Sequence, residues 1–128
     1  MGLILDSSVL IAVERQGKNA RQVLAALSEK LDETEIGISV ITLIEIAHGA
    51  ARADTAERKA KREKPVFPVT VSVALRTGQL DGENQAKGLR LPLPDLLIGV
   101  TALDLGYGVG AANLRHFRQV AGLKVIEL

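Results

Sequence analysis

The sequence has no cysteine and no tryptophan, and aromatic residues make up only 2% of it. The absence of cysteine excludes disulfides and cysteine-based zinc sites. The scarcity of aromatic rings argues against a protein that reads RNA by stacking bases on aromatic platforms. His48 and His116 are too few for a histidine-rich metal site. Any metal must therefore be held mainly by oxygen atoms.

A strong charge of one sign is also missing. The chain has 16 basic and 15 acidic residues and a net charge of +1, so any nucleic-acid contact must be local. Long apolar runs are missing too, because Glu45, Asp95 and Asp104 interrupt the longest of them. A bilayer span needs about 20 apolar residues, and no basic leader precedes the first apolar segment. We therefore expect a cytoplasmic protein with no membrane segment.

What the sequence does contain is a repeated change from short apolar runs to helical patterns. Its 128 residues, 47% of them hydrophobic, fit one compact domain. Apolar and β-branched runs predict strands at residues 2–5, 36–40, 66–71, 107–112 and 124–126. Helices are expected after Asp6, over 23–31, over 42–52, over 73–80 with a break at 81–84, and over 96–106. This alternation predicts an α/β fold with a mainly parallel sheet of about five short strands.

Three carboxylates stand among apolar neighbours near the expected starts of helices. Asp6 follows the first strand, Glu45 comes three residues after Thr42, and Asp95 precedes the most apolar helix. Taken singly, each fits a helix cap, and Thr42 with Glu45 has the spacing of a capping box. In parallel sheets, however, functional groups gather beyond the carboxyl ends of the strands. Carboxylates gathered there repel one another and suit Mg²⁺ or Mn²⁺, which can activate water for phosphodiester hydrolysis.

Four segments carry a resemblance to a known family. They are LILDSSVLI from Leu3, ISVITLIEIAHG from Ile38, PDLLIGVTAL from Pro94 and ANLRHF from Ala112. In this order, and over nearly the whole chain, they resemble the PIN-domain ribonuclease toxins of VapBC toxin-antitoxin systems. The resemblance implies that residues 1–128 form a single PIN domain, an α/β/α sandwich.

The resemblance also implies an acidic metal site and its partners. Asp6 and Asp95 would be the closest ligands of Mg²⁺ or Mn²⁺, Glu45 would act through water, and Asn113 would complete the catalytic set without adding charge. The family implies hydrolysis of structured RNA such as tRNA or rRNA. It further implies inhibition by a VapB-like antitoxin and assembly as a homodimer.

Five polar residues lie beside the predicted catalytic set. Ser7 and Ser8 share the helix start of Asp6 and are expected to hydrogen-bond to a carboxylate or a phosphate. Arg115, His116 and Arg118 are candidates for contact with the RNA backbone. For His116, a role as general base and a role in packing or hydrogen bonding both stay open.

The chain also departs from the family pattern. Ala111 stands where many relatives carry threonine, and the stretch from Ala53 to Pro65 is short, so residues are expected to be absent between Lys64 and Pro65. Ala111 and the neutral Asn113 leave a second hypothesis open, a PIN-like module that binds a partner or RNA but cuts weakly or not at all. A third hypothesis, an aspartyl-phosphate enzyme, is disfavoured because the position two residues after Asp6 is serine.

Overall fold

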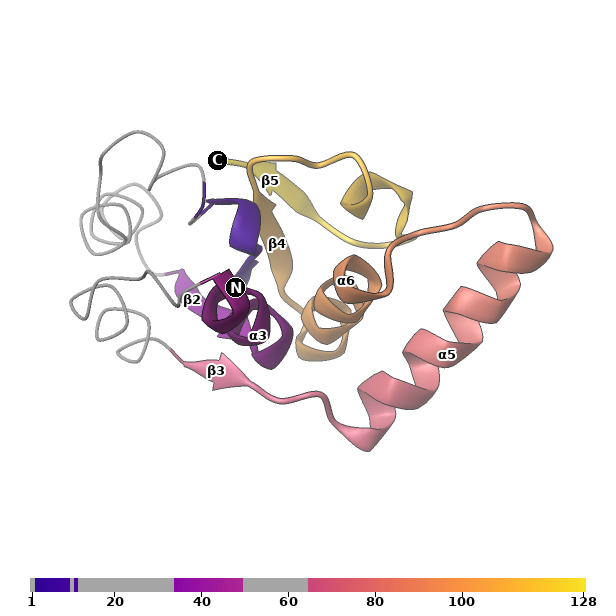
Figure 1. Cartoon of the computed structure of the whole chain (residues 1–128), viewed down its shortest axis with the longest axis horizontal. Coiled ribbons are helices and arrows are strands. Elements are labelled where there is room, and N and C mark those ends of the chain that lie inside the picture. Colours follow the sequence, from indigo (N-terminus) through magenta and orange to yellow (C-terminus); the bar gives the residue numbers. More distant parts are fainter. Residues whose placement is uncertain (1, 10, 12–33, 50–64) are drawn as a thin grey trace.

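The computed structural model describes residues 2–9, 11, 34–49 and 65–128 (Figure 1). Five strands form one sheet in the order β3-β2-β1-β4-β5, and all neighbours are parallel. The strands are β1 (Gly2–Leu5), β2 (Glu35–Ser39), β3 (Val66–Phe67), β4 (Gly108–Ala111) and β5 (Val125–Glu127). The prediction of a mainly parallel sheet of five short strands is confirmed.

The central strand β1 is buried on both faces, which explains its unbroken apolar sequence. Its side chains alternate between two core clusters. Leu3 and Leu5 pack with Ile36 and Ile38 of β2 on one face, while Ile4 packs on the other face with residues of α6 (Leu93–Leu105) and β4. This burial fixes the register of β1 and so fixes where the strand delivers Asp6.

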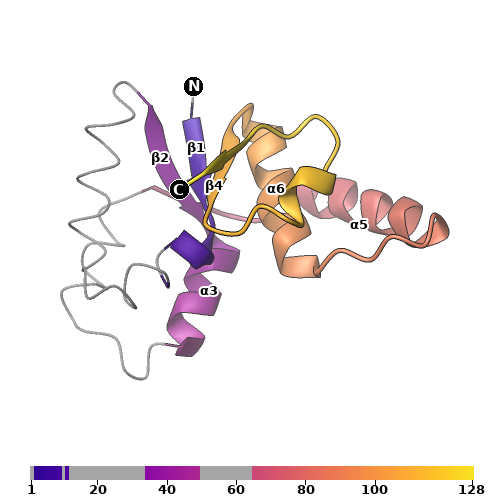
Figure 2. The same ribbon diagram turned by 90° about the horizontal axis from the view of Figure 1, so that it is seen from above.

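Two of the described helices lie in layers on the face of the sheet that Ile4 occupies. Figure 2 shows α6 against the sheet and α5 (Val71–Ala86) beyond it. Between the two helices, Val73 of α5 packs with Leu96 and Val100 of α6 in a third buried cluster. Gly106 ends α6 with φ of 71°, a left-handed conformation that favours glycine. The prediction that this helix is the most buried agrees with six buried residues within it.

Two helix predictions are wrong in their boundaries. The break expected at 81–84 does not occur, because α5 runs on to Ala86 and ends before Gly88, where φ is 78°. A side-chain hydrogen bond from Gln85 to Asp81 spans this stretch along the helix. The helix expected from residue 96 begins at Leu93, which places Asp95 in its first turn.

The capping box proposed for Thr42 and Glu45 is also wrong. The helix α3 (Val40–Gly49) begins two residues earlier, and the hydroxyl of Ser39 accepts the hydrogen bond from the Ile41 amide. Thr42 is therefore inside the helix. The strand expected over 66–71 is only Val66–Phe67, at the edge of the sheet, because Thr70 already caps α5 by accepting from the Val73 amide.

Some expectations fall on residues that the structure does not describe. They are the helix over 23–31 and the short stretch before Pro65. In the described ranges, no helix is long and apolar enough to cross a membrane.

Candidate active site

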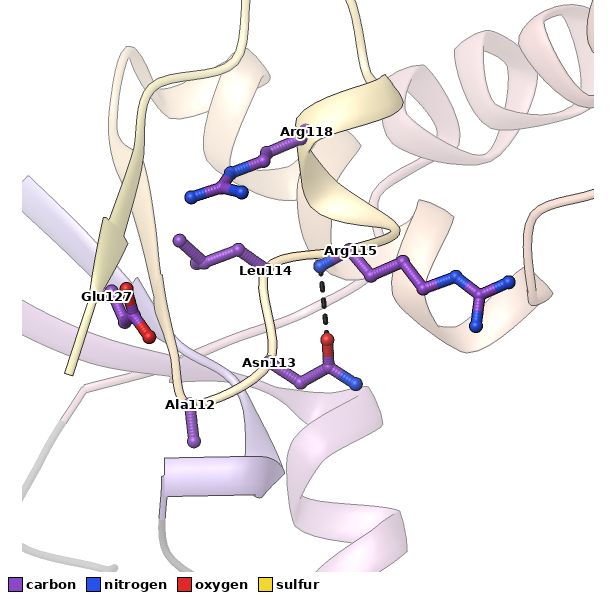
Figure 3. A pocket seen from close by; sticks show the side chains of 6 residues that line it. All are labelled: Ala112, Asn113, Leu114, Arg115, Arg118 and Glu127. Carbon is purple, nitrogen blue, oxygen red and sulfur yellow. Dashed lines mark hydrogen bonds between the residues drawn. The ribbon is translucent and has the colours of Figure 1, made fainter.

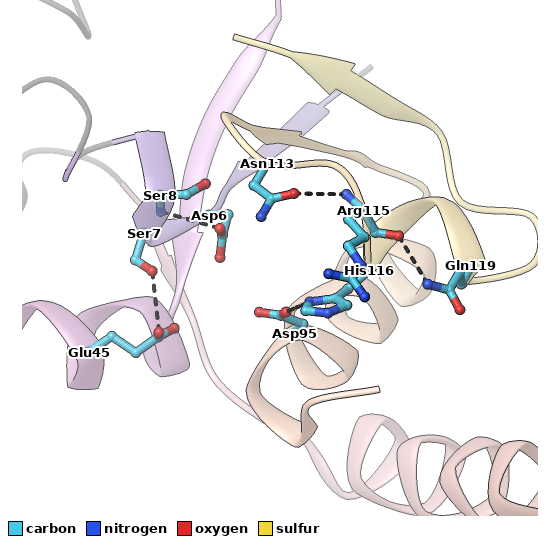
Figure 4. Close-up of polar contacts among 9 residues, drawn as sticks. All are labelled: Asp6, Ser7, Ser8, Glu45, Asp95, Asn113, Arg115, His116 and Gln119. Carbon is cyan, nitrogen blue, oxygen red and sulfur yellow. Dashed lines mark hydrogen bonds and ion pairs between the residues drawn. The ribbon is translucent and has the colours of Figure 1, made fainter. Parts of the chain in front are cut away.

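The three predicted carboxylates come together at the carboxyl end of the sheet. Asp6 is the first residue after β1, Glu45 lies in the second turn of α3, and Asp95 lies in the first turn of α6. Figure 4 shows Asp6 between the other two. The topology produces this meeting, because parallel strands end on the same side and the following helices start there.

Asp6 is held rigidly and is only 6% exposed. Its amide donates to the carbonyl of Gly110 at 2.9 Å, and its Oδ2 accepts from the Ser8 amide at 3.2 Å in the manner of a helix cap. Its Oδ1 is buried and has no hydrogen-bond partner in the described part of the chain. Burial raises the pKa of Asp6; hydrogen bonds from Ser8 and Ser7 oppose this rise, and the charge of Asp95 adds to it. No cationic side chain is among the groups of the described residues that shift this pKa.

Glu45 is placed by a contact that sequence reasoning missed. The buried Thr42 donates from Oγ1 to the carbonyl of Leu5 at 3.3 Å, which ties α3 to the end of β1. Ser7 Oγ then donates to Glu45 Oε2 at 3.3 Å. Partial burial and the charge of Asp6 raise the pKa of Glu45, the hydrogen bond from Ser7 lowers it, and Asp95 raises it further. The expected contact between Ser7 and a carboxylate is confirmed.

Asp95 is paired with His116. The imidazole Nδ1 lies 2.7 Å from Asp95 Oδ2, and the side chains of His116 and Asp95 are 31% and 23% exposed. Of the roles left open for His116, the structure shows the hydrogen bond. The two residues are 21 positions apart, and no local pattern in the sequence indicates that they meet.

Asn113 and Ser8 lie on the opposite side of Asp6 from Glu45. The Asn113 side chain is exposed, its Oδ1 accepts from the Arg115 amide at 3.1 Å, and its amide group is turned toward Asp6 (Figure 4). Ser8 Oγ accepts from the Ala112 amide at 3.1 Å, which joins the turn after β4 to the turn after β1. This hydrogen bond gives Ser8 a structural role at the site.

The turn after β4 also carries two arginines on a pocket of about 510 Å³. The pocket is lined by Ala112, Asn113, Leu114, Arg115, Arg118 and Glu127. Figure 3 shows Arg118 reaching toward β5, where Glu127 lies, and Arg115 extending in the opposite direction, toward α6. The two guanidinium groups thus flank Asn113 and place positive charge beside the acidic site.

The donor set fits a hard divalent cation in charge and chemistry. All three carboxylates offer oxygen, and Asp6 Oδ1 is buried without a partner among the described residues. Burial, and after it the charge of a neighbouring carboxylate, raises the pKa of Asp6 and of Glu45. Within the described part of the chain, no three acidic or histidine side chains stand close enough to hold a metal ion as placed.

Comparison with known proteins identifies the family. The PIN domain family model matches residues 3–123. Ribonuclease VapC1 of Rickettsia felis is 26% identical over an alignment of 137 residues, gaps included, and the alignment covers 100% of this chain and 97% of that protein. A chain in the DNA-bound VapBC structure from Salmonella typhimurium has a TM-score of 0.77 at 23% identity, covering 99% of this chain and 98% of that one.

A toxin-antitoxin complex from Klebsiella pneumoniae contains a chain with a TM-score of 0.73 at 24% identity, and each chain is covered in full, 100% and 100%. These likenesses show the same fold. The family model spans nearly all of the sequence and includes the segments that carry Asp6, Glu45 and Asp95. The chain belongs to the PIN domain family.

Proposed function

We propose that this protein is the toxin of a toxin-antitoxin pair and an endoribonuclease that depends on Mg²⁺ or Mn²⁺, built as one PIN domain over residues 1–128. Its relatives support the activity, because the matching protein of Rickettsia felis is named a ribonuclease. The observation that carries the proposal is the buried, unpaired Oδ1 of Asp6 in the field of Asp95 and Glu45. This arrangement is costly for a metal-free protein and is relieved by a cation.

In the proposed reaction, the cation and the side chains of this protein have separate roles. A bound Mg²⁺ or Mn²⁺ supplies Lewis acidity that activates water and stabilises charge on the phosphate. Asp6 and Asp95 would hold the cation directly, and Glu45 would reach it through water. Ser7 keeps Glu45 directed at the site through its hydrogen bond to Oε2. The exposed amide of Asn113 would orient a water or a phosphate oxygen.

The substrate in this proposal is structured RNA, tRNA or rRNA, and it would enter over the turn after β4. Arg115 and Arg118 are exposed and flank Asn113, so they can contact consecutive phosphates beside the acidic site. Ser7 and Ser8 are further candidates for contact with a phosphate; the Ser7 hydroxyl donates to Glu45, and the Ser8 oxygen accepts from the Ala112 amide.

The similarity to solved VapBC complexes also supports a proposal for the partner of this protein and for its location. The solved relatives from Salmonella typhimurium and Rickettsia felis are VapBC complexes, which supports a VapB-like antitoxin as partner in the cytoplasm. The apolar side chains of Val71 (78% exposed), Leu75 (72%) and Leu93 (53%) support a homodimer that pairs helical faces. Light scattering of the free protein tests the dimer.

The test of the activity is cleavage of total cellular RNA by antitoxin-free protein, with Mg²⁺ or Mn²⁺ against EDTA. Asp95→Asn should abolish discrete cuts, because it removes one of the two charges that hold the cation. Asp104→Asn is the matched control, since Asp104 lies at the far end of the same helix and accepts an exposed hydrogen bond from Ser72 there. Full activity of Asp95→Asn in metal-containing buffer would contradict the mechanism.

A second candidate is a PIN module that binds RNA or a partner but cuts weakly. It is favoured by Ala111, which is fully buried in β4 and offers no hydroxyl to the site, and by the neutral side chain of Asn113. If folded wild-type protein binds Mn²⁺ and RNA yet produces no new 5′ ends under any metal condition, this second function replaces the first.

A further inference from the structure

The contact between His116 and Asp95 has a geometry that the reaction described above does not use. A carboxylate at neutral pH has no proton to give, so Nδ1 of His116 must donate to Asp95 Oδ2 across the 2.7 Å between them. Figure 4 shows the ring on the outer side of Asp95, away from Asp6 and Glu45. The ring therefore holds one oxygen of Asp95 and leaves the other for the site.

The turn that carries His116 is built to hold the ring in place. Leu114 (8% exposed) and Phe117 (2% exposed) anchor it in the core on either side of the histidine. The Gln119 amide donates to the carbonyl of His116 at 3.1 Å, and Gln119 Nε2 donates to the carbonyl of Arg115 at 3.2 Å. The donor is thus fixed before any cation binds, which is the condition for a group that orients a ligand.

We propose that His116 is a positioning residue, which sets the orientation of the Asp95 carboxylate and so the affinity of the site for a divalent cation. This inference rests on the proposed function. Hydrogen-bond donors behind a metal-ligating carboxylate fix its direction, and their loss typically weakens metal affinity or activity about 10- to 100-fold. His116 acts here through Asp95 and not by touching the substrate.

The atom that donates decides which replacement restores the function. In His116→Asn the side-chain amide nitrogen stands near the position of Nδ1 and can still donate to Asp95. In His116→Gln the amide lies farther out, near the position of Nε2, and His116→Ala has no donor at all. The three variants therefore separate the Nδ1 hydrogen bond from the bulk of the ring and from any role of Nε2.

The readout is the affinity of metal-free, RNA-free protein for Mn²⁺, measured from the free-ion signal in electron paramagnetic resonance. His116→Ala and His116→Gln should weaken binding about 10- to 100-fold, and His116→Asn should recover most of the loss. Asp104→Asn is the control, because it removes a carboxylate from α6 at the opposite end of that helix from Asp95. Its Mn²⁺ affinity should equal that of the wild type. Circular dichroism melts show that each variant is folded.

Three outcomes would overturn the inference. Equal affinity in all variants would mean that the hydrogen bond has no effect, and equal loss in His116→Asn would assign the role to the ring itself. Rescue by His116→Gln instead of His116→Asn would point to Nε2. Wild-type RNA cleavage is measured alongside, so cleavage with unchanged Mn²⁺ affinities rejects only this inference. A wild type that neither binds Mn²⁺ nor cuts RNA rejects the proposed function itself.

Discussion

Replacing Asp6 with asparagine is expected to stabilise the metal-free protein. The carboxylate is 6% exposed, and no described residue forms a hydrogen bond with its Oδ1. Asparagine keeps an oxygen that accepts from the Ser8 amide, so the helix cap survives while the buried charge is removed. A buried polar group without a partner costs about 1–3 kcal/mol, and a charged one costs more. The NH₂ group of asparagine, which would take the place of Oδ1, keeps the neutral cost, so the gain is the excess cost of the charge, about 1 kcal/mol. For a chain of 128 residues, 1 kcal/mol corresponds to about 4 °C, so the melting temperature should rise by about 4 °C.

The pH dependence of this gain follows from the raised pKa of Asp6. The folded protein holds the proton to higher pH than the unfolded chain, whose value is near 3.8. Wild-type stability therefore falls as pH rises from the unfolded value through the raised folded value. Below that window the wild-type Asp6 is protonated and neutral, so wild type and Asp6→Asn should melt at similar temperatures. Above this pH window, the difference in melting temperature between wild type and Asp6→Asn should reach its full size.

The assay is thermal melting at neutral pH, in EDTA and with saturating Mg²⁺ or Mn²⁺. A cation at one hundred times its dissociation constant adds about 2.7 kcal/mol to the wild type, or about 10 °C for this chain length. Asp6→Asn should lack that response, so its advantage in EDTA should shrink or reverse with metal. Asp104→Asn, an exposed control, should change neither the melting temperature in EDTA nor its rise with metal by much. A lower melting temperature for Asp6→Asn in EDTA would refute the reasoning.

Three further changes test how the site is held. Thr42→Val should cost about 1 kcal/mol in urea denaturation, because it removes the buried hydrogen bond to the end of β1; unchanged stability would contradict this. Ser7→Ala should raise the pKa of Glu45, since the serine hydrogen bond lowers it, and a carbon-13 NMR titration of the metal-free protein that shows no rise would contradict it. Arg118→Ala should reduce the salt dependence of single-stranded RNA binding in EDTA by about 0.7 in log-log slope. An unchanged slope would place Arg118 outside the RNA contact.

The parts of the site that the sequence predicted are those set by local patterns. Asp6 ends an apolar strand, and Asp95 follows a proline at the head of an apolar helix, so strand order alone brings them to one edge of the sheet. Thr42 was misassigned because two polar residues compete to start α3, and Ser39 takes that role. The pairing of Asp95 with His116 depends on how the turn after β4 folds back, which no periodicity encodes.

Helix capping does not explain why Asp6 is an aspartate. Asparagine or serine would accept the same bond from the Ser8 amide without bringing a charge into the core. Stability would favour such a neutral cap, because burial and the charge of Asp95 both raise the pKa of Asp6. Among the described residues, no cationic side chain is one of the groups that shift the pKa of Asp6. The cation of the proposed function would give the charge of Asp6 a role, and it would do the same for Asp95 and Glu45.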